Sequence, residues 1–136
     1  MEEIWVYGGR ERKFEWFWAV DRTMPGLDAF EALSEAAQDL FWSCLTHWGN
    51  IAHGARPSRS RVNTEHEEPL IVAVKAGQHR FTAFRENSGP DWILCHHYFK
   101  QSERRDRAGD RAVRRTLTSR QAYLSMRRDG TYYERN

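Results

Sequence analysis

Three strand-like segments follow one another at short intervals in the second half of the chain, and no other feature restricts its fold as strongly. They are Leu70–Lys75, His79–Arg85 and Trp92–Phe99, all rich in β-branched and aromatic residues. The connections, residues 76–78 and 86–90, are short and both contain glycine. Because turns of this kind join antiparallel neighbours, the sequence predicts a β-meander over residues 70–99.

Apolar residues recur at intervals of three and four on either side of this meander, which predicts two amphipathic helices. The first covers residues 27–48 and begins at a capping box formed by Asp28 and Glu31. The second covers residues 110–128 and is strongly basic. Residues 51–69 show no periodicity and are rich in Gly, Pro, Ser and Arg, so they are expected to form a long basic loop.

The N-terminal region predicts one more strand, over Lys13–Val20, which can form a hairpin with Ile4–Tyr7 across two glycines. The expected fold is therefore α+β, with an antiparallel sheet of about four strands and with helices over one face. A chain of 136 residues fits a single domain spanning residues 1–136. Within it, residues 1–13 are expected to be an N-terminal extension and residues 129–136 a polar tail.

Several classes of protein and of site are not expected. No apolar run approaches the ~20 residues that span a bilayer, and an acidic start followed by basic residues is unlike a secretory signal. We therefore expect a cytoplasmic protein with no membrane partner. Cys44 and Cys95 are expected to be reduced core residues, since neither belongs to a metal-ligand motif. No metal and no cofactor are expected.

Acidic and basic residues are distributed unevenly along the chain. Residues 1–54 contain four Lys or Arg against nine Asp or Glu, a net charge of −5, whereas residues 55–136 contain seventeen against ten, a net charge of +7. Almost all the basic residues are arginine, whose planar fork matches phosphate bidentately. The asymmetry indicates a polyanionic partner on one face of the molecule. Solvated helix faces with paired charges are the alternative.

Cationic and imidazole side chains gather in the predicted meander. Alternation puts Arg80 on one face of its strand with Thr82 and Phe84, and predicts that His96 shares a face with Leu94. Cations can stabilise charge on phosphate oxygens, and an imidazole can move a proton near neutral pH, so the set suits phosphodiester cleavage without a metal. Hydrogen-bonded structural histidines and paired strand arginines are the alternative. The sequence does not fix the strand register.

The order of these elements carries a family resemblance. Residues 70–85, residues 93–102 and the basic helix after them resemble the phage-derived HigB-like branch of the RelE/ParE toxin superfamily, over about residues 14–125. The resemblance implies a RelE-like fold and a type II toxin that arrests growth as an mRNA interferase, usually in the ribosomal A site. In that family the 2′-hydroxyl attacks the neighbouring phosphate without a metal. A cognate antitoxin, expected to be a helix-turn-helix protein, silences the toxin.

The resemblance also implies roles for individual residues. Arg80 matches the phosphate-stabilising arginine, His96 the motif histidine, which we expect to act as base, and Lys100 the first motif lysine. Lys75 and Arg85 are expected to support RNA binding from neighbouring strands. The basic helix and the segment before it would add contacts to the RNA backbone through Arg104, Arg105, Arg111, Arg114 and Arg115.

The chain departs from the family pattern at two positions. Gln101 stands where a second lysine is expected, which removes one charge, and His97 stands where a small residue is expected. The superfamily also contains gyrase inhibitors with no nuclease activity. A non-catalytic nucleic-acid-binding or gyrase-inhibiting toxin is therefore a second hypothesis, and a structural phage protein is a third. The basic helix could equally contact an acidic partner protein.

Overall fold

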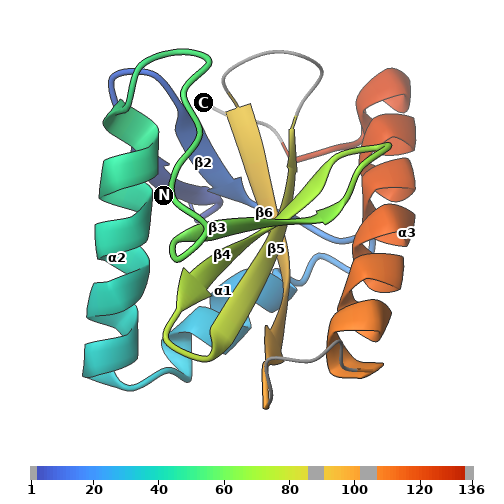
Figure 1. Ribbon diagram of the computed structural model, residues 1–136. Helices are drawn as coiled ribbons and strands as arrows, with labels where there is room; N and C mark the ends of the chain where they lie inside the picture. The colour runs from blue at the N-terminus through green and yellow to red at the C-terminus, as the bar shows by residue number, and fades with distance from the viewer. Residues whose placement is uncertain (1–2, 86–90, 102–106, 134–136) are drawn as a thin grey trace.

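A six-stranded sheet lies between helices on both its faces in the computed structural model, which describes residues 3–85, 91–101 and 107–133 (Figure 1). The general class is α+β, as predicted. No helix in these ranges combines the length and the apolar content needed to cross a membrane. In chain order the elements are β1 (Trp5–Gly8), β2 (Lys13–Trp16), α1 (Pro25–Glu31), α2 (Glu35–Asn50), β3 (Val62–His66), β4 (Ile71–Ala76), β5 (His79–Arg85), β6 (Asp91–Phe99) and α3 (Arg107–Asp129).

The sheet is larger and less regular than the expected four antiparallel strands. Its order is β1-β2-β6-β5-β4-β3, and β2 runs parallel to β6 while all other neighbours are antiparallel. The direction of β2 was predicted wrongly because β2 and β6 are far apart in the chain, so no turn between them dictates their relative direction. The predicted meander is confirmed as β4, β5 and β6, and the predicted β1–β2 hairpin is confirmed as well.

The loop predicted over residues 51–69 contains a strand that the sequence analysis missed. β3 pairs with β4, and Thr64 lies opposite Val72. The strand is short, lies at the edge of the sheet and carries mostly polar residues, with Val62 its one buried residue. A segment with so little apolar content gives a weak strand pattern, and the pairing with β4 provides most of its stability.

The predicted first helix is divided in two. α1 ends at Glu31, and α2 begins after Ser34, whose side chain accepts a hydrogen bond from the backbone N–H of Ala37 at 3.2 Å. Ser34 is thus the N-cap of the longer helix, and the capping box assigned to Asp28 and Glu31 is wrong. The apolar period continues through both helices because both pack on the same face of the sheet, which hides the break from a pattern search.

Replacing Ser34 with alanine should destabilise the protein by about 1 kcal/mol, because the first turn of α2 loses its side-chain acceptor. Ser34→Asp keeps an acceptor beside the helix N-terminus and is expected to retain most of the stability. Urea denaturation of the three proteins measures the difference. Equal midpoints for wild type and Ser34→Ala would contradict the assignment of this cap.

Two separate cores hold the layers together. On one face α2 packs against the sheet through residues such as Phe41, Leu45 and Trp48. On the other face α3 contributes Tyr123, which packs against Phe84 with ring centroids 5.3 Å apart. The expectation that helices cover a single face is therefore wrong. The strands already indicate this, since consecutive residues 71–74 of β4 are all buried, as in a sheet that is covered on both sides.

The end of the chain after α3 is not a simple polar tail. Tyr132 is buried, its ring lies 4.7 Å from that of Tyr123, and its hydroxyl accepts a hydrogen bond from the backbone N–H of Trp18 at 3.0 Å. Gly130, at φ +73°, lets the chain turn back after α3 towards the core. The segment that follows α3 thus closes the second core, and its last three residues lie outside the described ranges.

Candidate functional site

A β-bulge in β6 decides which histidine faces which helix. Phe81 of β5 lies opposite His97 and Ala83 lies opposite Leu94, so β6 contains one more residue than β5 between these pairs. His97 consequently lies on the α2 face, where its ring is 5.0 Å from Phe81. His96 lies on the α3 face. The simple alternation that placed His96 on the side of Leu94 is wrong because it allows for no bulge.

The α3 face carries a row of cationic and aromatic residues across three strands. Lys75 of β4 lies opposite Arg80 of β5, and Arg80 lies opposite Tyr98 of β6. Thr82 and Phe84, which share a face with Arg80, contact Thr116 and Tyr123 of α3. The predicted common face of Arg80, Thr82 and Phe84 is thus confirmed, and the structure brings Lys75 and Arg80 together on it.

Arg80 is half-buried and held by the β4–β5 turn. Its Nη1 donates to the carbonyl oxygens of Gly77 and His79, at 2.5 and 3.2 Å. Within the described residues, Nε and Nη2 make no hydrogen bond or ion pair. These two groups form one edge of the guanidinium, and that edge matches two oxygens of a phosphate. The side chain is fixed on one side and open on the other.

Lys75 stands in a strongly electropositive neighbourhood. Its ammonium donates to the backbone carbonyl of Arg59. Burial lowers its pKa, and the positive charges of Arg80, Lys100 and Arg59 lower it further, while Glu65 acts in the opposite direction. These four charged side chains therefore lie within electrostatic range of Lys75. Such a cluster favours an anion, because an anion offsets the mutual repulsion of the cations.

Glu65 is a site residue that the sequence analysis missed. The hydroxyl of Tyr98 donates to its Oε1 at 2.9 Å, a hydrogen bond that reaches from β6 to β3 across the two strands between them. Its Oε2 accepts from Asn63 Nδ2 at 3.1 Å. A carboxylate is thus fixed beside the cations of the α3 face. The only sequence signal was the alternation of residues 62–66, which was interpreted as loop.

His96 lies on the same face but is engaged with α3. Its Nε2 is 2.8 Å from the hydroxyl of Ser119, and its backbone N–H donates to Thr82 Oγ1 at 3.1 Å. Burial lowers the pKa of His96 to about 4, and the positive charge of Arg115 contributes. The imidazole is therefore neutral at pH 7. A neutral imidazole can accept a proton, but so low a pKa makes it a weak base.

The low pKa of His96 makes stability dependent on pH. The unfolded chain binds a proton at about 6.5 and the folded chain only at about 4, so between these values the unfolded state binds more protons and stability falls as pH falls. An NMR titration of the assigned ring should give a midpoint near 4. Urea denaturation at pH 7 and pH 5 should show a smaller loss for His96→Gln, whose amide can still reach Ser119. A midpoint near 6.5 would contradict the buried position.

The remaining predicted RNA-binding residues fall into three groups. Arg111, Arg114 and Arg115 are exposed on the first half of α3, and Arg115 lies near enough to His96 to affect its pKa. Arg85 is on the opposite face of the sheet, with its guanidinium 5.5 Å from the Trp92 ring centroid, so the structure does not bring it to the cationic cluster. The remaining two predicted residues, Arg104 and Arg105, lie outside the described residues.

Two further histidines, His79 and His97, form a pair on the α2 face. His79 Nδ1 lies 2.9 Å from His97 Nε2, and the two rings stack with centroids 5.1 Å apart. Burial lowers the pKa of both rings, with Arg80 contributing at His79 and His79 contributing at His97. The structure thus separates His97 from His96 and joins it to His79, so the three imidazoles do not form one catalytic group.

The two cysteines are free and buried, as predicted. Burial raises the pKa of Cys44, and it raises that of Cys95 to about 12, so neither forms a thiolate nucleophile at neutral pH. In the part of the chain that the structure describes, no group of three or more His, Cys, Asp or Glu residues is arranged to hold a metal ion.

The structure gathers cationic and hydrogen-bonding side chains on the α3 face of the sheet. Lys75, Arg80 and Lys100 supply positive charge, Tyr98 and Glu65 supply a hydrogen-bonded acid and base, and α3 supplies an arginine-rich border. Comparisons with known proteins add no identification: no family model matches the chain, and no curated protein matches it.

Proposed function

We propose that the protein is a metal-independent endoribonuclease that cleaves messenger RNA, and that it acts as the toxin of a type II toxin–antitoxin pair. The observation that carries the proposal is the pairing of Lys75 with Arg80 on the α3 face, beside the Tyr98–Glu65 hydrogen bond. The open edge of the Arg80 guanidinium fits a phosphodiester, and the nearby ammonium groups fit the charge that develops during its cleavage.

The chemistry needs an attacking hydroxyl and two proton transfers. The 2′-oxygen of the ribose attacks the adjacent phosphorus, its proton passes to a base, and the bond from phosphorus to the 5′-oxygen breaks. The leaving 5′-oxygen takes up a proton, and the products carry a 2′,3′-cyclic phosphate and a 5′-hydroxyl. Arg80 stabilises the charge on the non-bridging oxygens, which is greatest in the transition state.

Three groups near Arg80 can move the protons. Glu65 is a carboxylate and can accept the proton of the 2′-hydroxyl. Lys75 is a cation whose pKa is lowered, so it gives up a proton more readily than a free lysine and suits the leaving 5′-oxygen. His96, the base expected from the family resemblance, takes part only if RNA displaces Ser119 from its Nε2.

The RNA backbone is proposed to continue from this face along the first half of α3. Arg111, Arg114 and Arg115 are exposed there and would contact successive phosphates. The same surface is where an acidic segment of an antitoxin would block RNA. Cleavage in a translating ribosome agrees with this arrangement, since the ribosome would present a short single-stranded codon to the half-buried Lys75 and Arg80 and the exposed arginines of α3.

The proposal is tested with a reporter mRNA in a purified translation reaction, read by primer extension. Wild-type protein should produce cuts within codons, and these cuts should be lost when ribosomes are omitted. Adding the helix-turn-helix protein encoded beside the toxin gene should suppress them. Intact mRNA with continuing translation at micromolar protein would refute the nuclease proposal.

One observation favours a second candidate, a non-catalytic nucleic-acid-binding toxin of the gyrase-inhibiting type. The pKa of His96 near 4 leaves the site without the near-neutral imidazole that general base catalysis prefers. This candidate predicts binding that weakens with salt, with a slope that reports the number of phosphates contacted, and no change in the length of the RNA. Gyrase supercoiling assays then identify or exclude its target.

A further inference from the structure

A cavity of about 690 Å³ lies on the α2 face of the sheet, at the C-terminal end of α2. Val72 and Trp92 line it from the sheet, Trp48 lines it from the helix, and residues 53–57 line it from the loop after α2. Its volume is within the range of small-molecule binding sites. Lys75 and Arg80 lie on the other face of the sheet and do not line the cavity, whereas Arg59 both lines the cavity and contributes to the charge around Lys75.

Arg12 links the loop after α2 to the C-terminal end of that helix. Arg12 Nη1 donates to the carbonyl oxygens of Trp48 and Ile51 at 2.9 and 3.0 Å, and Nη2 donates to those of Ala52 and Ala55 at 3.4 and 3.3 Å. The cation thereby satisfies carbonyls at the end of α2 and after it, where its charge also complements the helix dipole. These four hydrogen bonds hold the loop that lines the cavity in place against the end of α2.

A close approach of two glycines supports the same arrangement. A Cβ on Gly9 would lie 2.4 Å from the carbonyl oxygen of Gly49, so only glycine allows this contact. The same oxygen accepts hydrogen bonds from the backbone N–H groups of Glu11 and Arg12, at 2.8 and 3.1 Å. The turn between β1 and β2 is thus attached directly to α2, and it holds Arg12 at the edge of the cavity.

Positive charge prevails in the lining. Four arginines take part, Arg12, Arg56, Arg59 and Arg85, against the two carboxylates of Glu11 and Glu67. The side chains of Arg56 and Arg59 make no hydrogen bond or ion pair with any other residue that the structure describes. Both are exposed and line the cavity, so their guanidinium groups are available for an anion.

The floor of the cavity is apolar and aromatic. Trp48 and Trp92 pack against each other with ring centroids 4.7 Å apart, and Leu70 and Val72 lie beside them. The Arg85 guanidinium stands over the Trp92 ring, 5.5 Å from its centroid, in a cation–π contact, and both residues line the cavity. Flat aromatic groups stack on guanidinium planes and on indoles.

We propose that this cavity binds a nucleoside phosphate, with the phosphate at Arg56 and Arg59 and the base against Arg85 and the apolar floor. The two exposed guanidinium groups in the lining suit the several oxygens of a phosphate better than the two oxygens of a carboxylate, and the volume exceeds what inorganic phosphate alone can fill. The inference does not depend on the nuclease proposal, because Lys75, Arg80 and Glu65, which carry that proposal, do not line the cavity.

The test titrates isotope-labelled protein with adenosine, cytidine, guanosine and uridine 5′-monophosphates, and follows the assigned indole N–H signals by NMR. At least one nucleotide should shift Trp48 and Trp92 saturably, while the exposed indole of Trp42 on α2 should not move. Inorganic phosphate alone and the matching nucleoside alone should each bind at least about tenfold more weakly, since each lacks one half of the contacts.

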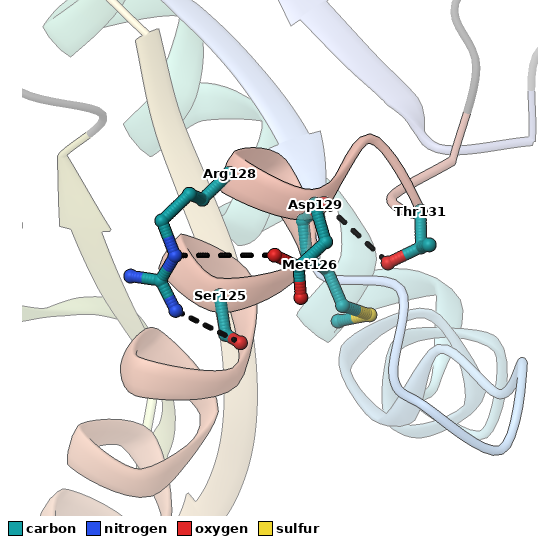
Figure 2. A network of polar contacts seen from close by, with 5 residues as sticks. All are labelled: Ser125, Met126, Arg128, Asp129 and Thr131. Atoms are coloured by element: carbon teal, nitrogen blue, oxygen red, sulfur yellow. Dashed lines mark hydrogen bonds and ion pairs between the residues drawn. The ribbon is translucent and has the colours of Figure 1, made fainter.

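Two variants locate the phosphate. Arg56→Ala and Arg59→Ala should each weaken nucleotide binding about tenfold, the loss expected for one charge-assisted contact. Arg128→Ala removes the same charge at the far end of α3, where Arg128 makes polar contacts only with Ser125 and Asp129 among the described residues, and it should bind like wild type (Figure 2). No saturable shift at millimolar nucleotide, equal affinity for inorganic phosphate, or unchanged affinity in both loop variants would overturn the inference.

Discussion

Replacing Arg80 with alanine should lower the rate of RNA cleavage by about 100- to 1000-fold, the loss found when one group that stabilises transition-state charge is removed. The reason is the position of its open edge: Nη1 is held by Gly77 and His79, so Nε and Nη2 can meet two phosphate oxygens without reorganisation. Single-turnover cleavage of the reporter mRNA, read by primer extension, gives the rate. Because the effect is in the transition state, binding of uncleaved RNA should weaken much less.

Two control variants separate charge from geometry. Arg80→Lys keeps the charge but loses the planar fork, and it should recover only part of the rate. Arg128→Ala loses an exposed arginine at the end of α3, away from the site, and should cleave like wild type (Figure 2). If Arg80→Ala retains full activity, or if Arg128→Ala loses as much, the α3 face is not where the phosphate is cleaved.

Replacing Phe41 with alanine should destabilise the protein by about 3–5 kcal/mol, a large part of the ~5–15 kcal/mol that holds a typical domain folded. Phe41 is fully buried between α2 and the sheet. Its ring lies 5.7 Å from Trp16, 4.9 Å from Phe30 and 5.0 Å from Phe81. Because these neighbours are themselves rigid aromatic rings, the cavity left behind cannot close. Urea denaturation monitored by circular dichroism measures the loss.

The matched control is the neighbouring residue on the same helix. Leu40 is 52% exposed, so Leu40→Ala should change stability by only about 0.5 kcal/mol. Both substitutions shorten an apolar side chain to alanine in α2, and their helix propensities change in the same favourable direction. Similar losses for the two variants would mean that α2 does not pack on the sheet through the face that contains Phe41.

The sequence predicted the elements whose pattern is local. The meander and α3 were recognisable because short turns and a strict apolar period identify them without tertiary contacts. The edge strand β3 and the parallel pairing of β2 with β6 were not, since both depend on contacts with strands elsewhere in the chain. The burial of Tyr132 has the same cause, because only Phe17, Trp18 and Tyr123 make it a core residue.

The candidate site was predicted in its composition but not in its geometry. Alternation correctly placed Arg80 with Thr82, and register then added Lys75 opposite Arg80. The bulge opposite Thr82 could not be inferred, because nothing in the residues around Cys95 requires an extra position in β6. That one residue decides that His96 meets Ser119 and that His97 meets His79. Glu65 was missed because the strand that carries it was missed.

In the proposed function, RNA is cleaved on the cationic α3 face by attack of its own 2′-hydroxyl. The most direct test is to identify the chemical ends of RNA that the wild-type protein cleaves in a translation reaction. Attack by the 2′-hydroxyl at a phosphate held by Lys75 and Arg80 leaves a 2′,3′-cyclic phosphate on one fragment and a 5′-hydroxyl on the other. We expect mass spectrometry to find these two ends at every cut, and a single 2′-deoxy nucleotide at a cut position to abolish that cut. Intact RNA, or fragments with a 3′-hydroxyl and a 5′-phosphate from an attacking water, would contradict the proposed mechanism.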